Sequence, residues 1–431
     1  MHTILLGLNE LNFKFVEKYI QLGYLPNFKK LFTEYGYIET TSEQEYSLLE
    51  PWIQWVTIHT GKTYAEHQVF RLGDIVERPE LTQIFELLED QGYRIGAVSP
   101  FNADNRLKNP AFFIPDPWTK TQAAGNFLIK NIAQAISQAV NDNAQGKLST
   151  KSLISLLTAL IYYTPINDCT WYGKRLSELK KNVATKALIL DKLLSDIFIK
   201  EWKKTRPDFS LLFLNSAAHL QHHYLFNSGA YTGNLKNPEW YCAANQDPIL
   251  AIYQLYDAIL ARVQQLPNVR LIVATGLSQQ PHEELTFYWR LKEHKQFLHA
   301  IGIDNFTVVY PRMSRDFLIE FATPELAEQA QEILKKVKAT DGENIFFVDN
   351  RNTSLFVELI YPYEISDDLN IIIDNITLPK FKQYVAFVAL KNGEHNAIGY
   401  YIDSARLTSE KRIPITQVHI NILKGFNSVN K

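Results

Sequence analysis

Short apolar segments that alternate with helical patterns restrict the fold of this chain more than any other feature of its sequence. Residues 3–7, 210–214 and 269–274 are almost wholly apolar, and the stretches between them have helical periodicity. Strands that are apolar on both sides are typical of parallel sheets, because helices cover both faces of such sheets. The sequence therefore predicts an α/β fold, a three-layer sandwich around a mostly parallel central sheet.

The order of these patterns divides the 431 residues into five segments. A core is expected to comprise residues 1–116, 201–315 and 376–431, with strands at 386–390 and 398–402 returning to its sheet. Residues 117–200 are predicted to form a helical insertion with a break at 141–146. Residues 316–375 are predicted to form a small α+β cap with the element order βαββ. A chain of this length suits one large α/β domain with insertions, or two to three compact domains.

Composition excludes several classes of protein. The chain has 44 basic and 46 acidic residues, so no positive field indicates a nucleic acid polymer as the partner. Two cysteines are too few for a disulfide framework or a cysteine-rich zinc ribbon. A fraction of 46% hydrophobic residues excludes a disordered chain. The first residues lead directly into a predicted strand without a secretion signal, which favours a cytoplasmic location.

The longest apolar stretch, residues 152–163, is shorter than the roughly 18 residues that a transmembrane helix needs. We therefore expect no transmembrane segment. The favoured interpretation of this stretch is a buried helix. A helix that lies on a membrane surface is the alternative, because Lys147 and Lys151 stand just before the apolar run.

Polar and ionisable residues stand where the predicted strands end, which is where open α/β sheets bind their ligands. They follow the first strand, precede the helix that starts at Pro51, and follow the strands at 210–214 and 269–274. One more lies between the last two predicted strands. These candidates are Asn9, Glu10, Glu50, His219, His222, His223, His282 and His395.

Each candidate also has a structural interpretation. Asn9 can form a side-chain turn, and Glu50 can cap the helix that follows it. His219 and His223 have the i, i+4 spacing that places two imidazoles on one helical face, as in many metal sites. His395 alone is typical of a turn. The residues by themselves leave these alternatives open.

Read in order, several of these segments resemble the alkaline phosphatase superfamily, most closely its type I phosphodiesterase and nucleotide pyrophosphatase branch. The resemblance covers nearly the whole chain outside the helical insertion and the α+β cap. It implies two divalent metal ions, usually zinc, held by aspartates and histidines, and cleavage of phosphate or sulfate esters. The matching segments are 6–9, 25–31, 55–61 with His67, 215–222, 393–395 with Gly399, and 414–423.

The chain departs from the family pattern at most of the chemically active positions. The aspartate after the first strand is replaced by Asn9, and the nucleophile position falls on Pro51 or Glu50, neither of which carries a hydroxyl group. The aspartate that precedes the first retained histidine is replaced by Ala218. An aspartate–histidine pair after the next strand falls on residues 275–276.

Two family histidines remain, His222 and His395, and together with Glu10 or Glu50 they suggest a rewired site for one divalent cation, zinc. The second cation position lacks most of its ligands. A metal-bound water is then the expected nucleophile. The candidate metal ligands are His222, His395, Asn9, His219 and His282, and the candidate catalytic residues are Glu50 and Glu10.

Two functions follow from the resemblance and its departures. The first is a diverged metal-dependent hydrolase of a phosphodiester, phosphate or sulfate ester, acting on a small molecule, a glycan or a nucleotide. The alternative is an inactive pseudoenzyme that binds a phosphorylated ligand, a glycan or a protein partner. If the family register is right, His222 and His395 converge at one edge of the sheet.

Overall fold

The computed structural model describes residues 1–141, 149–312, 315–374, 376–406 and 410–427. It divides into two compact units. The first comprises residues 1–234, 238–281 and 393–431, and the second comprises 235–237 and 282–392. The second unit contains all of the expected 316–375 cap and extends beyond it on both sides. The five-segment division of the chain stays a prediction.

The first unit is built around an eight-stranded sheet with the strand order β17-β2-β16-β6-β1-β5-β3-β4. In the middle, β1 pairs in parallel with β5 on one side and with β6 on the other, and β3 continues in parallel to β4. Only β16 runs antiparallel to its neighbours. The predicted mostly parallel sheet is therefore confirmed. The strands are β1 (His2–Leu8), β2 (Ile38–Thr41), β3 (Ile95–Val98), β4 (Phe112–Ile114), β5 (Phe209–Leu214), β6 (Val269–Ala274), β16 (Ile398–Asp403) and β17 (Arg412–Pro414).

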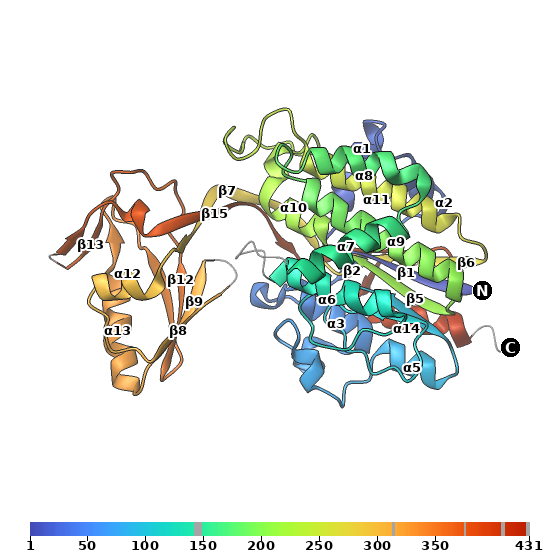
Figure 1. Cartoon of the computed structure of the whole chain (residues 1–431), viewed down its shortest axis with the longest axis horizontal. Coiled ribbons are helices and arrows are strands. Elements are labelled where there is room, and N and C mark those ends of the chain that lie inside the picture. Colours follow the sequence, from blue (N-terminus) through green and yellow to red (C-terminus); the bar gives the residue numbers. More distant parts are fainter. Residues whose placement is uncertain (142–148, 313–314, 375, 407–409, 428–431) are drawn as a thin grey trace. The chain divides into compact units, whose positions relative to one another are not determined.

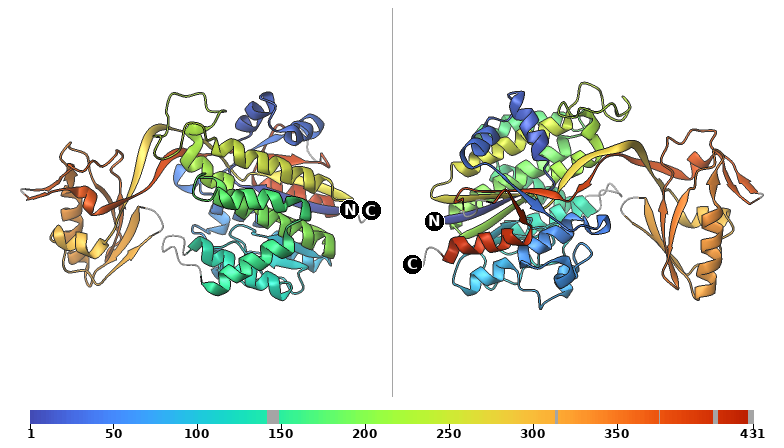
Figure 2. Two further views of the ribbon diagram at one scale, coloured as in Figure 1. Left: turned by 45° about the horizontal axis from the view of Figure 1, so that its top comes forward. Right: turned by 180° about the vertical axis from the view of Figure 1, so that it is seen from behind.

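Helices cover both faces of this sheet, which completes the three predicted layers (Figure 1, Figure 2). One layer packs its apolar side chains against the sheet around Trp55, Phe85 and Ile422. It consists of α3 (Pro51–Thr60), α5 (Ile84–Asp90) and α14 (Thr416–Asn427). The opposite layer contains α1 (Phe13–Gln21), α2 (Pro26–Tyr35), α9 (Thr185–Thr205), α10 (Ser216–Tyr224) and α11 (Pro248–Gln264).

The helical insertion is present as α6 (Phe127–Asn141), α7 (Thr150–Tyr163), α8 (Cys169–Ser177) and the start of α9. Most of the break predicted at 141–146 lies outside the described residues. The prediction that 152–163 is buried is wrong, because α7 packs on α6 and α9 and most of its side chains are not buried by the described residues. Its buried residues are Ser152, Ala159 and Tyr163. In the described part of the chain, no helix is long and apolar enough to cross a membrane.

The second unit is α+β. A four-stranded antiparallel sheet has the order β11-β12-β9-β8, and a three-stranded sheet has the order β10-β13-β14. The elements are β8 (Val308–Pro311), β9 (Asp316–Glu320), β10 (Lys338–Ala339), β11 (Phe346–Asn350), β12 (Ser354–Leu359), β13 (Ile371–Ile373), β14 (Ile376–Leu378), α12 (His294–Ala300) and α13 (Pro324–Lys336).

Two long strands, β7 (Ser278–Leu291) and β15 (Val385–Asn396), pair with each other and connect the two units along the chain. The prediction that 386–390 returns to the core sheet is wrong. Phe387 packs on Phe287 and Trp289 of β7, with ring centroids 6.2 and 5.5 Å away. This aromatic cluster between two paired strands accounts for the apolar run that resembled a core strand.

Acid destabilisation is expected from His59, which lies in α3 with no exposed surface. Burial lowers the pKa of His59 to about 3, although a hydrogen bond to the Phe101 carbonyl opposes this effect. An unfolded histidine has a pKa of about 6.5, so as the pH falls the unfolded chain takes up this proton first. The stabilising effect of a neutral His59 is therefore complete above the unfolded pKa of about 6.5. It is lost as the pH falls toward the folded pKa of about 3.

Between about pH 7 and about pH 4.5, the free energy of unfolding is expected to fall by about 2–3 kcal/mol more in the unmodified protein than in His59→Gln. Denaturant titrations at several pH values measure this difference. The exposed His299 provides the control, because His299→Gln is expected to retain the acid sensitivity. Equal pH profiles for the unmodified protein and His59→Gln would contradict the expectation.

Candidate metal centre

Three side chains from distant segments of the first unit converge at the carboxyl edge of its sheet. Glu10 follows β1, His222 lies on α10 directly after β5, and His395 lies near the end of β15. One ligand atom from each lies within 4.8 Å of the other two. The Glu10 Oε2 atom is 3.3 Å from His222 Nε2 and 3.4 Å from His395 Nε2. The predicted convergence of the two histidines is confirmed, with ring centroids 5.0 Å apart.

The backbone of Glu10 brings its carboxylate into this group. Its φ of 58° lies in the left-handed region, which is unfavourable for a residue with a long side chain. The Glu10 N–H donates to the Thr275 carbonyl at 3.0 Å, and its own carbonyl accepts from Gln221 Nε2 at 2.8 Å. These two hydrogen bonds hold the Glu10 backbone in a conformation that turns its side chain toward the histidines. Strain of this kind is typical of functional sites.

Two buried amides hold the carboxylate itself. Glu10 Oε1 accepts a hydrogen bond from Asn9 Nδ2 at 3.0 Å, and Oε2 accepts one from Gln279 Nε2. Burial raises the pKa of Glu10, but the two imidazoles outweigh this effect and hold that pKa well below its usual range. The Glu10 side chain is therefore an oriented anion, as a metal ligand must be.

Asn9 was expected to be a metal ligand, but its side-chain oxygen has another partner. Its Oδ1 atom accepts a hydrogen bond from Trp55 Nε1 at 2.8 Å, and its amide also donates to Asn215 Oδ1 at 2.7 Å. The oxygen that would have to bind a cation is thus directed at an indole N–H. The structure places Asn9 beside Glu10 as the donor that orients its carboxylate.

The second nitrogen of each imidazole faces an oxygen atom, at hydrogen-bond distance for His222 and farther away for His395. His222 Nδ1 lies 3.3 Å from the Gly393 carbonyl oxygen, and His395 Nδ1 lies 3.8 Å from Glu50 Oε2. Gly393 must lack a side chain, because a Cβ atom there would lie 2.7 Å from the Gln221 carbonyl oxygen and closer still to Gln279. The close approach of Gly393 keeps its carbonyl within reach of His222.

Glu50 occupies the N-cap position of α3, yet its side chain makes no cap hydrogen bond with the described residues. The interpretation of Glu50 as a helix cap is therefore not supported by its contacts. Burial raises the pKa of Glu50; the His395 imidazole opposes this shift and the Glu10 carboxylate adds to it. Its carboxylate faces the His395 nitrogen that is turned away from Glu10.

The other candidate histidines lie outside the convergent group. His219 is exposed on α10, with its ring centroid 5.0 Å from that of His223, as their i, i+4 spacing predicts. His282 belongs to the second unit, where its Nε2 atom is 3.3 Å from the Thr286 hydroxyl. Among the described residues, Glu10, His222 and His395 are the one such group of three or more histidine, cysteine or acidic side chains.

Sequence reasoning did not identify the residues that support this group. Gln279, Gln221 and Asn215 are neutral amides, and their role is visible only through the atoms that they contact. Gln279 lies in the polar segment after β6. Its position at the end of a strand was the one feature of the sequence that could have indicated a role for it in the site. Trp55 was matched only as part of a family segment.

The donor set fits a divalent cation. Ligands about 2.0–2.1 Å from a tetrahedral zinc ion lie about 3.3 Å from each other, and catalytic zinc sites include sets of two histidines and one glutamate. Glu10 Oε2 lies 3.3 Å from His222 Nε2 and 3.4 Å from His395 Nε2, which matches this ligand–ligand distance. Gln279 adds a buried Oε1 atom for which the described residues supply no hydrogen-bond donor. The three side chains thus lie close enough together to hold one divalent cation.

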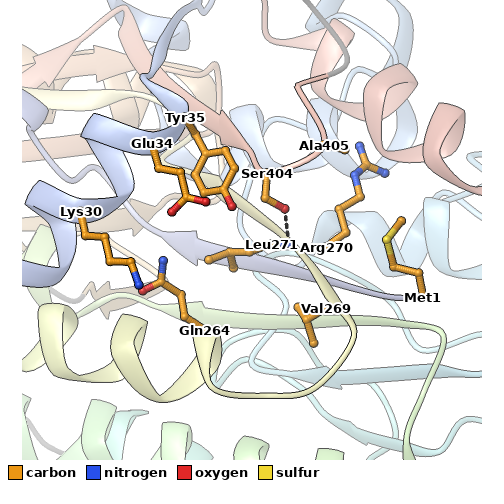
Figure 3. Close-up of a pocket in the computed structure, with 10 residues that line it drawn as sticks. All are labelled: Met1, Lys30, Glu34, Tyr35, Gln264, Val269, Arg270, Leu271, Ser404 and Ala405. Carbon is orange, nitrogen blue, oxygen red and sulfur yellow. Dashed lines mark hydrogen bonds between the residues drawn. The ribbon is translucent and has the colours of Figure 1, made fainter.

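A cavity of about 390 Å³ lies at the opposite, amino edge of the sheet, near Met1 and Val269 (Figure 3). Its most polar lining residue, Arg270, already has partners: it forms an ion pair with Asp403 and donates to two carbonyl groups of α14. The cavity has no group comparable to the three ligands, so the candidate site is at the carboxyl edge.

Comparisons with known proteins complete the description. No family model matches the sequence, and no curated protein matches it either. Solved structures of similar fold include phosphonoacetate hydrolase from Sinorhizobium meliloti 1021, with 12% identity, a TM-score of 0.43, and coverage of 97% of this chain and 94% of that one.

Two further solved structures are similar to nearly the whole chain. Murine ectonucleotide pyrophosphatase/phosphodiesterase 5 has 11% identity and a TM-score of 0.46, with 99% of this chain and 95% of that one covered. The alkaline phosphatase from the Antarctic bacterium TAB5 has 11% identity and a TM-score of 0.42, with 98% and 96% covered. Likeness at this identity concerns the fold, so the chemistry of the site rests on its own residues.

Proposed function

We propose that this chain hydrolyses a small phosphodiester, phosphate or sulfate ester, such as that of a nucleotide or a glycan, with one zinc ion held by Glu10, His222 and His395. The observation that carries the proposal is the convergence of these three ligand atoms within 4.8 Å. A cation held there would polarise an ester oxygen and lower the pKa of a water molecule. The sequence offers ligands for one such cation, since the second family position lacks them.

The chain's own residues supply orientation and proton transfer. The amides of Asn9 and Gln279 orient the Glu10 carboxylate, and the Gly393 carbonyl orients His222. Burial raises the pKa of Glu50, which is the direction that proton transfer to a leaving oxygen near neutral pH requires. We assign Glu50 the role of general acid and base, through its Oε2 atom next to His395.

Water rather than a side-chain hydroxyl is the attacking group in this proposal. The helix that presents the family's nucleophile starts here with Glu50 and Pro51, and neither side chain can attack phosphorus as an alcohol does. Addition of water to the phosphorus or sulfur centre breaks the ester bond. Glu50 gives its proton to the departing oxygen, and the proton that the attacking water loses then returns to the Glu50 carboxylate.

The cellular compartment is part of the same proposal. Cys169 is exposed, Cys242 is buried, and neither forms a disulfide bond. An exposed thiol is compatible with a reducing environment, which supports a cytoplasmic location.

Metal analysis and turnover assays test the function together. Protein purified without a histidine tag is expected to contain or bind about one zinc ion per chain. It is expected to hydrolyse at least one of three substrates, p-nitrophenyl phosphate, bis-p-nitrophenyl phosphate and p-nitrophenyl sulfate, until a chelator removes the metal. Added zinc should restore the rate, and His222→Gln should remain inactive.

Two results would overturn the hydrolase. Protein that binds no added divalent cation would refute the metal centre. Protein that binds zinc but hydrolyses none of the three esters would favour the alternative, a pseudoenzyme that binds a phosphorylated ligand, a glycan or a protein partner.

A further inference from the structure

Helix α7 of the helical insertion has an apolar face that the described residues do not cover. Its buried residues, Ser152, Ala159 and Tyr163, lie on one side of the helix. Successive residues of an α-helix are about 100° apart around its axis. On this basis, four residues lie within an arc of about 100° on the side opposite the buried residues. That side carries large apolar side chains, which are 48–85% exposed: Leu153, Ile154, Leu157 and Ile161. A surface helix normally presents charged and polar residues there.

The hydroxyl groups of α7 add little polarity to its surface. Ser155 Oγ donates to the Lys151 carbonyl at 2.9 Å, and Thr158 Oγ1 donates to the Ile154 carbonyl at 2.8 Å. Each of these two hydroxyl groups thus donates its hydrogen bond to a carbonyl group of the same helix. The same arrangement allows serine and threonine side chains to lie in lipid. Beyond the helix, Ile166 is 90% exposed and extends the apolar character. The helix is therefore suited to a non-aqueous environment on one side.

The surrounding segment is positively charged, although the whole chain has a formal charge of −2. Residues 150–186 contain six basic and two acidic side chains. Both acidic side chains have basic partners: Glu178 pairs with Arg175 at 2.7 Å, and Asp168 pairs with Lys192 at 2.6 Å. The segment thus retains an excess of exposed cations, namely Lys151, Lys174, Lys180, Lys181 and Lys186.

We propose that the exposed face of α7 binds the surface of an anionic lipid bilayer, with the helix lying in the plane of the membrane. Apolar side chains on one face and lysines in the same segment of the chain are the two features that hold such a helix at the interface between headgroups and acyl chains. The excess of positive charge is the reason for choosing an anionic bilayer over a second copy of the chain. The proposal concerns the insertion alone and does not depend on the metal centre.

Vesicle binding by the full chain tests this proposal. The protein is expected to sediment with vesicles in which about a third of the lipid is phosphatidylglycerol, and less with pure phosphatidylcholine. The triple variant Ile154→Asn, Leu157→Gln, Ile161→Asn is expected to bind at least about tenfold more weakly. Because these side chains are exposed, its circular dichroism and melting temperature should match those of the unmodified protein.

A lysine variant tests the electrostatic contribution to vesicle binding, and a variant in the second unit serves as a control for the apolar contribution. Lys174→Gln with Lys180→Gln and Lys181→Gln is expected to reduce binding to anionic vesicles and its sensitivity to salt. Ile376→Asn is the matched control, since Ile376 is 64% exposed in the second unit and should not contribute.

Failure to bind either vesicle would overturn the proposal, as would equal losses in Ile376→Asn and the α7 variant. Self-association that the α7 variant abolishes, without any vesicle binding, would identify a second copy of the chain as the partner and would also overturn it.

Discussion

Glu10→Gln is expected to lower the affinity for zinc by at least about hundredfold, because it removes the one anionic ligand from a set of three. Glutamine has the same shape as glutamate, so it can keep the left-handed backbone and the hydrogen bond from Asn9. It lacks the charge that the two imidazoles face at 3.3 and 3.4 Å. Competition with a chromophoric chelator measures the affinity directly.

His219→Gln is the matched control for Glu10→Gln. His219 lies one helical turn before His223 on the same helix as His222, but it is exposed and outside the convergent group. Its replacement is expected to leave zinc affinity unchanged. If His219→Gln lost the metal and Glu10→Gln retained it, the ligand set would be wrong and the i, i+4 histidine pair would be the site.

Glu50→Gln is expected to separate metal binding from turnover. The variant should still bind one zinc ion, with affinity reduced by about 10–100-fold, because Glu50 contacts the outer nitrogen of a ligand. Turnover should fall by about 100-fold or more if Glu50 transfers the proton. The melting temperature should change little, since the Glu50 side chain makes no cap hydrogen bond in the described structure.

Glu45→Gln serves as the control for Glu50→Gln. Glu45 is exposed, five residues earlier, and stands in the equivalent position before a short 3-10 helix. It should keep both metal binding and turnover. A Glu50→Gln variant with unchanged turnover would refute the proton-transfer role, and one that loses stability alone would restore the interpretation as a helix cap.

The core strands could be predicted from the sequence because burial on both sides leaves an almost wholly apolar run, as in β1, β5 and β6. The same signal misled at 386–390, where an aromatic cluster between β7 and β15 produces a similar run. The apolar run at 152–163 also led to a wrong prediction, because the composition of a helix does not reveal how much of its surface other elements cover. The described residues cover one side of α7, and the apolar residues of the other side are exposed among them.

The site could be predicted in part for a similar reason. His222 and His395 were found by family position, and both converge. The sequence offered Glu10 and Glu50 as alternative carboxylates, and the structure places Glu10 next to both histidines. That choice depends on the left-handed backbone of Glu10 and on hydrogen bonds from two amides, neither of which leaves a pattern in the sequence.

A crystal structure of the zinc-loaded protein tests the central claim most directly. The account predicts one zinc ion bound by Glu10, His222 and His395 at about 2.0–2.2 Å from each ligand atom, with Glu50 next to the outer nitrogen of His395. Zinc bound instead between His219 and His223, with Glu10 still facing both His222 and His395, would contradict it.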